Sequence, residues 1–182
     1  MEFEPTEIPD VVLIHPRVHI DSRGSFLESW QARKFAAAGL NPTFVQDNHI
    51  HSHRNTLRGL HYQTHPAQGK LVRVATGAVF DVAVDLRRSS PTFGGWVGVE
   101  LSAENHRMLW VPPGFAHGFV VLSDSVDFLY RCTEYWQPAH ERTVIWNDSH
   151  LDIDWPLPSG ALPVLSEKDA AGVQFIEAEH FP

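Results

Sequence analysis

From Thr56 to Thr133 the sequence is a succession of short segments in which apolar and polar residues alternate, with turn residues between them. This alternation predicts β-strands, because side chains two residues apart share one face of a strand. Many short strands separated by turn signals are typical of a β-sandwich or barrel. The strands expected in this region are 56–63, 70–75, 78–86, 95–101, 107–111, 116–122 and 126–133.

The flanking regions add extended segments and very little helix. Segments 11–15, 25–30 and 43–53 are expected to be extended, with 11–15 as an edge strand and a tight turn at 21–24. Helices are expected over 31–38 and 166–171. Ser166 has the character of an N-cap, and acidic residues follow it in the first turn.

These elements predict an all-β protein, a jelly-roll β-sandwich with short peripheral helices. A length of 182 residues suits a single domain, 1–182. We expect the jelly-roll core over about 11–145 and a C-terminal segment, 146–182, that folds back over it. The open mouth of such a barrel is where a ligand is expected to bind.

Composition excludes several classes of protein. The formal net charge of −8 argues against a general nucleic-acid binder, which would carry a basic stripe. The single cysteine, Cys132, excludes an intrachain disulfide framework and a cysteine-based zinc cluster, and it favours a reducing compartment. The N-terminal residues are too acidic for a signal peptide, and no apolar run reaches the ~18 residues of a membrane span. We therefore expect a cytoplasmic protein with no membrane or nucleic-acid partner.

The strand 56–63, TLRGLHYQ, carries the most chemistry. A glycine inside a strand often marks a bulge or a close backbone approach, and a bulge at Gly59 would turn Arg58 and His61 to one side. A histidine in such a strand is a core residue about as often as it is a catalytic base. Asp169 would favour the second reading if its carboxylate oriented the imidazole, as in a serine-protease triad. Tyr130 lies in a central apolar strand, where it is either a core residue or an acid.

Other chemistry is less well supported. His49, His51 and His53 alternate, so on a strand they would share one face and could bind zinc or iron. We favour a solvent-facing strand edge, because no acidic or sulfur ligand has a supporting spacing. The sequence has no Gly-x-Ser-x-Gly elbow and no Gly-rich or Walker phosphate loop. A nucleotide would therefore be held by side chains, for which the candidates are Arg23, Arg58 and Lys70.

Eight stretches, roughly from Val11 to Val173, are distinctive: DSRGSFLE, VQDNHIHS, TLRGLHYQ, QGKLVRV, VFDVAVDLRRSSPTFG, ENHRMLWVPPGFAHGF, FLYRCTEYW and LSEKDA. Taken together, they resemble the dTDP-4-dehydrorhamnose 3,5-epimerase family, whose members are cofactor-independent sugar-nucleotide epimerases of the cupin class. The resemblance implies a cupin-like jelly roll and no cofactor. It also implies a homodimer with exchanged strands, in which some site residues come from the partner chain.

The same resemblance implies a role for each candidate residue. His61 matches the catalytic base, Asp169 its dyad partner, Tyr130 the general acid and Lys70 a lysine near the sugar keto oxygen. No metal is implied, because the His-x-His pair of metal-binding cupins reads His61-Tyr-Gln here. The implied substrate-binding residues are Arg23 and Arg58 at the pyrophosphate, Gln46, Asn48, Phe26 and Glu28 at the deoxythymidine, His117 in the pocket, and Trp136 stacking on the base or its neighbours.

The implied reaction inverts C3 and C5 of dTDP-4-dehydro-6-deoxy-D-glucose to give dTDP-4-dehydro-L-rhamnose. A related dTDP-4-keto-sugar 5-epimerase, 3-epimerase or ketoisomerase would use the same histidine and tyrosine, so the sequence leaves these alternatives open. A non-catalytic sugar-nucleotide-binding cupin would keep Arg23 and Arg58 but would not need His61, Asp169 and Tyr130 together. A metal-dependent cupin oxygenase or isomerase is the third class.

Overall fold

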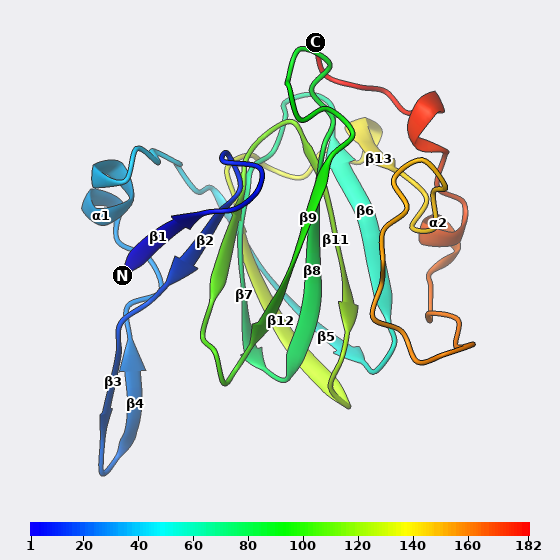
Figure 1. Ribbon diagram of the computed structural model, residues 1–182. Coiled ribbons are helices and arrows are strands. Elements are labelled where there is room, and N and C mark those ends of the chain that lie inside the picture. Colours follow the sequence, from blue (N-terminus) through cyan, green and yellow to red (C-terminus); the bar gives the residue numbers. More distant parts are fainter.

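Two antiparallel sheets face each other in the computed structural model, which describes residues 1–182 (Figure 1). The first sheet has the order β1-β2-β10-β7-β12-β5, and the second has the order β13-β6-β11-β8-β9. The strands of the first sheet are β1 (Glu2–Pro5), β2 (Val12–His15), β10 (Met108–Val111), β7 (Lys70–Thr76), β12 (Ser125–Cys132) and β5 (Gln46–His53). Those of the second are β13 (Glu141–Thr143), β6 (Leu57–Gln63), β11 (Phe115–Val121), β8 (Ala78–Asp85) and β9 (Trp96–Ser102).

The remaining elements are short and peripheral. Strands β3 (Val18–Asp21) and β4 (Gly24–Leu27) pair only with each other. The helices are α1 (Ala32–Ala37), α2 (Glu167–Ala170) and two 3₁₀ turns, η1 (Pro138–His140) and η2 (Phe175–Glu177). The predicted all-β jelly-roll sandwich with short peripheral helices is thus confirmed. No helix is long and apolar enough to cross a membrane.

The main core lies between the two sheets, where the inward-facing residues of the alternating strands meet. It contains 16 buried residues, among them Val72 and Phe128 from the first sheet and Val79 and Phe119 from the second. The rings of Phe119 and Phe128 stack with their centroids 4.3 Å apart. Burial of each such side chain contributes about 1.5–3 kcal/mol, so this layer holds the sheets at a fixed separation.

The chain after β13 covers the other face of the second sheet. There Leu57 and Leu60 of β6 belong to one buried cluster with Trp155 and Phe175. Backbone pairing between Thr56 and Val164 also ties this segment to the sheet. In Figure 1 the segment runs along the outside of β6 and carries α2 with it. The second sheet is therefore buried on both faces.

Helix α1 covers part of the outer face of the first sheet. Phe35 is buried there with Ile14, Met108 and Trp110. Gln31 caps the helix by accepting a hydrogen bond of 2.8 Å from the Lys34 N–H. The helix stops before Gly39, whose φ of +82° is a left-handed conformation that glycine adopts easily.

Three strands, β1, β3 and β13, were not expected, and one predicted strand was given the wrong place. Strand β2 was predicted as an edge strand, but it pairs with both β1 and β10. One edge strand of this sheet is β1, whose four residues, ending at Pro5, are too few to show a clear period. Strand β13 has three residues, which is too short for a period to be visible.

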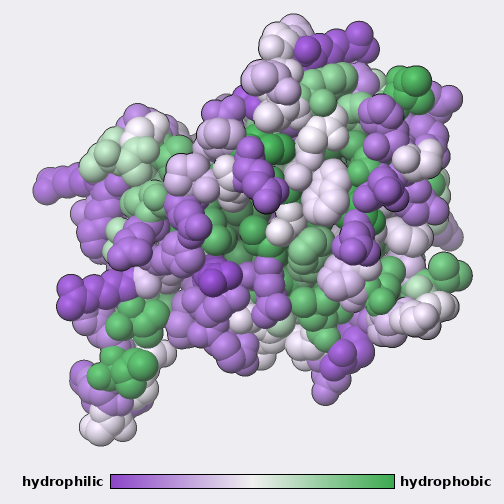
Figure 2. Space-filling view, viewed as in Figure 1, coloured by the Kyte–Doolittle hydropathy of each residue, from purple (hydrophilic) through white to green (hydrophobic).

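Strands β3 and β4 form an arm that projects from the sandwich (Figure 1). The predicted turn at Asp21–Gly24 joins them, and Gly24 has a φ of +129°. Ile20 is 81% exposed and Phe26 is 70% exposed, and Figure 2 shows apolar atoms on this arm at the lower left.

Candidate active site

Strand β6 bulges at Gly59. His61 pairs with His117 and Arg58 pairs with Phe119, so β6 has one more residue than β11 between these two pairs. Gly59 has a φ of +126°, and a Cβ atom there would lie 2.6 Å from the Cα of Gly118. Only glycine allows this backbone approach. The expected bulge is confirmed, and Arg58 and His61 line the same cavity.

That cavity, of about 330 Å³, lies between the two sheets. Each sheet contributes one wall, and the loops and the C-terminal segment complete the lining. The second sheet supplies Arg58, His61, His117, Phe119 and Glu141, and the first supplies Gln46, Asn48, Ile50, Lys70, Phe128, Tyr130 and Cys132. Gln68, Trp136 and Lys168 complete the lining.

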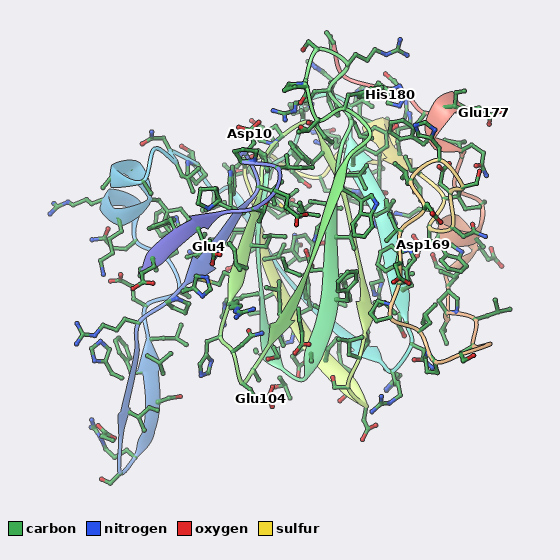
Figure 3. The ribbon with its side chains drawn as sticks, in the orientation of Figure 1. Glu4, Asp10, Glu104, Asp169, Glu177 and His180 are labelled. Carbon is green, nitrogen blue, oxygen red and sulfur yellow. The ribbon has the colours of Figure 1, made fainter.

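His61 contacts the carboxylate of Asp169, which the C-terminal segment brings to β6. Figure 3 shows Asp169 beside that strand. The His61 Nε2 donates to Oδ1 of Asp169, whose residue is only 2% exposed. Burial lowers the pKa of the His61 imidazole, and the nearby carboxylate opposes this shift. Burial alone would raise the pKa of Asp169, but hydrogen bonds from His61 and Ser166 outweigh it and hold that pKa below its usual value. The pair is therefore a neutral base oriented by an anion at neutral pH.

Tyr130 and Lys70 line the opposite wall, on the neighbouring strands β12 and β7. Burial raises the pKa of Tyr130 to about 12, so its hydroxyl keeps its proton and can donate it. Lys70 forms no ion pair, and burial lowers the pKa of its ammonium group. Next to Lys70 in the register, Cys132 has a pKa raised by burial to about 11 and is a neutral thiol.

A second histidine–carboxylate pair lies in the wall of the cavity. His117 Nε2 is 3.0 Å and 3.1 Å from the two carboxylate oxygens of Asp81. Both residues are buried. Burial raises the pKa of Asp81, and the neighbouring His117 opposes that rise. His117 is thus a pocket residue, as the sequence predicted, but its carboxylate partner was not foreseen.

The predicted nucleotide-binding side chains of β5 and β6 are present in the cavity. Gln46 Nε2 donates to Asn48 Oδ1 over 3.1 Å, and the Trp136 N–H donates to Gln46 Oε1 over 3.0 Å. The Trp136 residue is 55% exposed. Arg58 donates to the Ser52 hydroxyl over 3.0 Å and pairs with no carboxylate, so its charge is available to an anion.

Three predicted binding residues lie outside the cavity of their own chain. Arg23 and Phe26 belong to the projecting arm, and the Arg23 guanidinium pairs with Asp21 at 2.7 Å. Glu28 follows the arm and pairs with Lys34 at 2.7 Å. None of the three lines the site that holds His61.

Sequence reasoning missed an ion pair in the lining of the cavity. Lys168 Nζ lies 2.9 Å from Glu141 Oε1, and both residues line the cavity. Lys168 precedes Asp169 in the predicted helix, and the segment that carries this helix was expected to fold back over the sheet. That expectation could have indicated that Lys168 lies near the cavity. Glu141 lies in strand β13, which has three residues and is too short for a sequence pattern to reveal.

The alternating histidines lie exposed on β5, the strand at the other edge of the first sheet from β1. His49 and His51 contact Asp127, at 2.9 Å and 3.1 Å, from the adjacent strand β12. The sequence spacing could not reveal this carboxylate. No group of three or more histidine, cysteine, aspartate or glutamate side chains has the arrangement of a metal site.

The fold is cupin-like, and the site it encloses suits an isomerase that moves protons between side chains and a bound substrate. A family model described as dTDP-4-dehydrorhamnose 3,5-epimerase matches residues 5–177. The chain belongs to the dTDP-4-dehydrorhamnose 3,5-epimerase family and is an isomerase.

Individual relatives agree with this assignment. A dTDP-4-dehydrorhamnose 3,5-epimerase of Pseudomonas aeruginosa is 60% identical over 176 residues, which is 96% of each chain. The crystal structure of a dTDP-6-deoxy-D-glucose-3,5-epimerase from Legionella pneumophila, in complex with dTDP-4-keto-L-rhamnose, has a TM-score of 0.94. It is 49% identical and covers 98% of this chain and 94% of that one. A 3′-monoepimerase from Streptomyces bikiniensis, in complex with dTDP-quinovose, has a TM-score of 0.88 at 34% identity and covers 94% and 87% of the two chains.

Proposed function

We propose that this protein converts dTDP-4-dehydro-6-deoxy-D-glucose to dTDP-4-dehydro-L-rhamnose by inverting C3 and C5, with His61 as the base and Tyr130 as the acid. The observation that carries the proposal is the position of these two side chains on opposite walls of one cavity. Epimerisation needs a proton removed from one face of a carbon and another delivered to the opposite face, which two opposed groups can do.

The C4 ketone of the substrate acidifies the protons at C3 and C5. His61, oriented by Asp169, removes such a proton and leaves an enolate. Lys70 stabilises the enolate oxygen by its charge, a contribution that is large where water is excluded. Tyr130 then protonates the carbon from the other side. Each positioned proton transfer is worth about 10²–10⁴-fold in rate. No cofactor is required, because the carbonyl that activates the protons is already in the substrate.

The nucleotide part of the substrate is assigned to the polar residues around this cavity. Arg58 would contact the pyrophosphate, since a guanidinium matches phosphate oxygens and this one has no carboxylate partner. Gln46 and Asn48 would hold the deoxythymidine, Trp136 would stack beside it, and His117 would complete the pocket wall.

Arg23, Phe26 and Glu28 would complete this site from a second copy of the chain. The exposed apolar side chains of the β3–β4 arm and its distance from its own sandwich support such an exchange (Figure 1). The protein is accordingly proposed to be a homodimer, with residues 1–182 as one cupin-like domain in each subunit. A cytoplasmic location fits Cys132, which is a free, buried thiol.

Solvent exchange in heavy water tests the reaction. The purified protein is incubated with the 4-keto sugar nucleotide in D₂O, and the products are examined by NMR and mass spectrometry. Deuterium at both C3 and C5, with L-rhamno stereochemistry in the product, is the expected result. Because the chain is similar to a 3′-monoepimerase, inversion of only one carbon of the sugar is the second candidate reaction. Label at only one carbon would therefore replace the double epimerase by a 3- or 5-epimerase, and a shifted carbonyl would indicate a ketoisomerase.

The same assay separates the two remaining classes. Exchange should persist after treatment with EDTA and removal of bound metal, and its loss and recovery with added metal would favour a metal-dependent cupin. Nucleotide binding without any exchange would favour a non-catalytic binding protein.

A further inference from the structure

The Asp169 carboxylate has a contact that the proposed proton transfer does not use. Oδ1 accepts from His61 and, over 3.3 Å, from the Gly59 N–H at the bulge. Oδ2 accepts from the hydroxyl of Ser166 over 2.7 Å. The two oxygens of one buried carboxylate are therefore held from opposite sides, by β6 on one side and by the start of α2 on the other.

Ser166 is also the N-cap of α2. Its Oγ accepts a hydrogen bond of 3.1 Å from the Asp169 N–H, so its single proton is free to go to the carboxylate. In a capping box the acidic side chain at the third helical position returns to the backbone N–H of the cap residue. Here Asp169 occupies that third position, but its carboxylate bonds to the Ser166 hydroxyl and to β6 instead. The helix start thus fixes the rotation of this carboxylate.

We infer that Ser166 is a positioning residue for the reaction: its hydroxyl holds Asp169 so that Oδ1 faces His61. This inference rests on the proposed role of His61 as the base. Without the hydroxyl, Oδ2 would be buried with no donor, and the carboxylate could turn away from the imidazole. The serine would then act on the base through Asp169, without touching the substrate.

The electrostatic surroundings of His61 define what Ser166 should change. The charged groups that face the imidazole are Asp169 and Lys168 from α2, Lys70 from β7 and Glu141 from β13. Of these, Asp169 makes the direct contact and raises the pKa of the imidazole against the effect of burial. A carboxylate that is held less firmly supports the imidazolium less well. Loss of the Ser166 hydroxyl should therefore lower the pKa of His61.

Three variants separate this role from simple capping. Ser166→Ala removes both the cap and the donor, whereas Ser166→Gly removes the donor but keeps a residue that is favoured at helix N-caps. Ser166→Thr keeps both. We expect kcat to fall about tenfold in the alanine and glycine variants, the size of effect expected when a hydrogen bond to a buried charged group is lost. KM should change little, and the acidic limb of the pH profile should move to lower pH. The threonine variant should restore both properties.

A measurement that does not depend on turnover completes the test. The pKa of His61 is followed by NMR of ¹⁵N-labelled histidine in the wild-type protein and in each variant. A lower pKa in the alanine and glycine variants, with recovery in the threonine variant, supports the inference even if the substrate is not the one proposed. An unchanged His61 pKa and an unchanged pH profile in the folded glycine variant would overturn it. Inactivity of the wild-type protein would instead refute the proposed function alone.

Discussion

Two histidine–carboxylate pairs line one cavity, and they differ in exposure and in the origin of the acid. His61 and His117 face each other across β6 and β11. The side chain of His61 is 23% exposed, whereas that of His117 is 7% exposed. Asp81 comes from the strand adjacent to His117, but Asp169 comes from a helix 108 residues beyond His61. The same two functional groups thus form a partly exposed pair in one place and a buried pair in the other.

The carboxylates also differ in how their charge is supported. Asp169 has three hydrogen-bond donors, from His61, Ser166 and the Gly59 backbone, and its pKa lies below the usual value. Burial raises the pKa of Asp81, for which His117 is the hydrogen-bonding side chain. An anion that is well supported can stabilise a histidine that gains a proton during turnover. The comparison therefore supports the proposal that the first pair transfers protons and the second maintains the structure of the pocket.

The largest effect should come from replacing the histidines one at a time. His61→Asn removes the base and should lower solvent exchange at the sugar by about 10³-fold, within the range of one general-base contribution. His117→Asn retains a side chain that can donate to Asp81, and it should lower exchange by only about tenfold. Deuterium incorporation measures both rates, and calorimetry with dTDP should show that each variant still binds nucleotide. Equal losses in the two variants would remove the distinction between the pairs.

Replacing the two carboxylates should affect the rate in the same order as replacing their histidines, but by smaller factors. Asp169→Asn should lower kcat by about 10²-fold, because the amide removes the charge that stabilises the protonated base. Asp81→Asn should change kcat by less than about tenfold, since in the proposed reaction its partner His117 takes no proton from the substrate. Steady-state rates give the comparison, and circular dichroism verifies that both variants are folded. A slower Asp81→Asn variant would mean that the buried pair also transfers protons.

The sequence predicted the parts of this comparison that depend on local pattern. The alternation and the glycine in TLRGLHYQ predicted a strand with a bulge, and Ser166 predicted the start of the helix that carries Asp169. The resemblance to a known family then related His61, Asp169 and Tyr130 to one another. These features could be predicted because each depends on residues close together in the chain or on a distinctive run of them.

Contacts between distant segments were not predictable from pattern. The pairing of Asp81 with His117 and of Glu141 with Lys168 depends on strand register and on a three-residue strand, neither of which has a periodic signal. Strand β1 was missed because its four residues, Glu2–Pro5, are too few to show a clear period. The place of Arg23 relative to the cavity depends on how the arm projects, which its own residues do not determine.

The smallest expected effect is a difference in how stability depends on pH. Asp169 has a lowered pKa, so it contributes stability above the unfolded value of about 3.9, and this contribution is lost as pH falls through the folded value. The difference in Tm between wild type and Asp169→Asn should therefore shrink below about pH 4. Asp81 has a raised pKa, so the wild-type protein should gain stability relative to Asp81→Asn as pH falls.

Thermal unfolding between neutral and acidic pH checks both signs. Each change of about 1 kcal/mol corresponds to roughly 2–4 °C in Tm for a chain of this size. For each variant, the difference in Tm from the wild-type protein is plotted against pH. If the two differences change in the same direction as pH falls, the opposite environments of the two carboxylates are contradicted.

The projecting β3–β4 arm has a consequence for the genetics of the proposed dimer. If each arm completes the cavity of the other subunit, a subunit with His61→Asn and a subunit with Arg23→Ala carry defects in different halves of a site. When the two inactive proteins are mixed and exchange subunits, one site of each mixed dimer holds both defects and the other holds none. Random pairing in a two-fold dimer then restores about a quarter of the sites. Intersubunit complementation of this kind occurs only when every active site is shared between two chains.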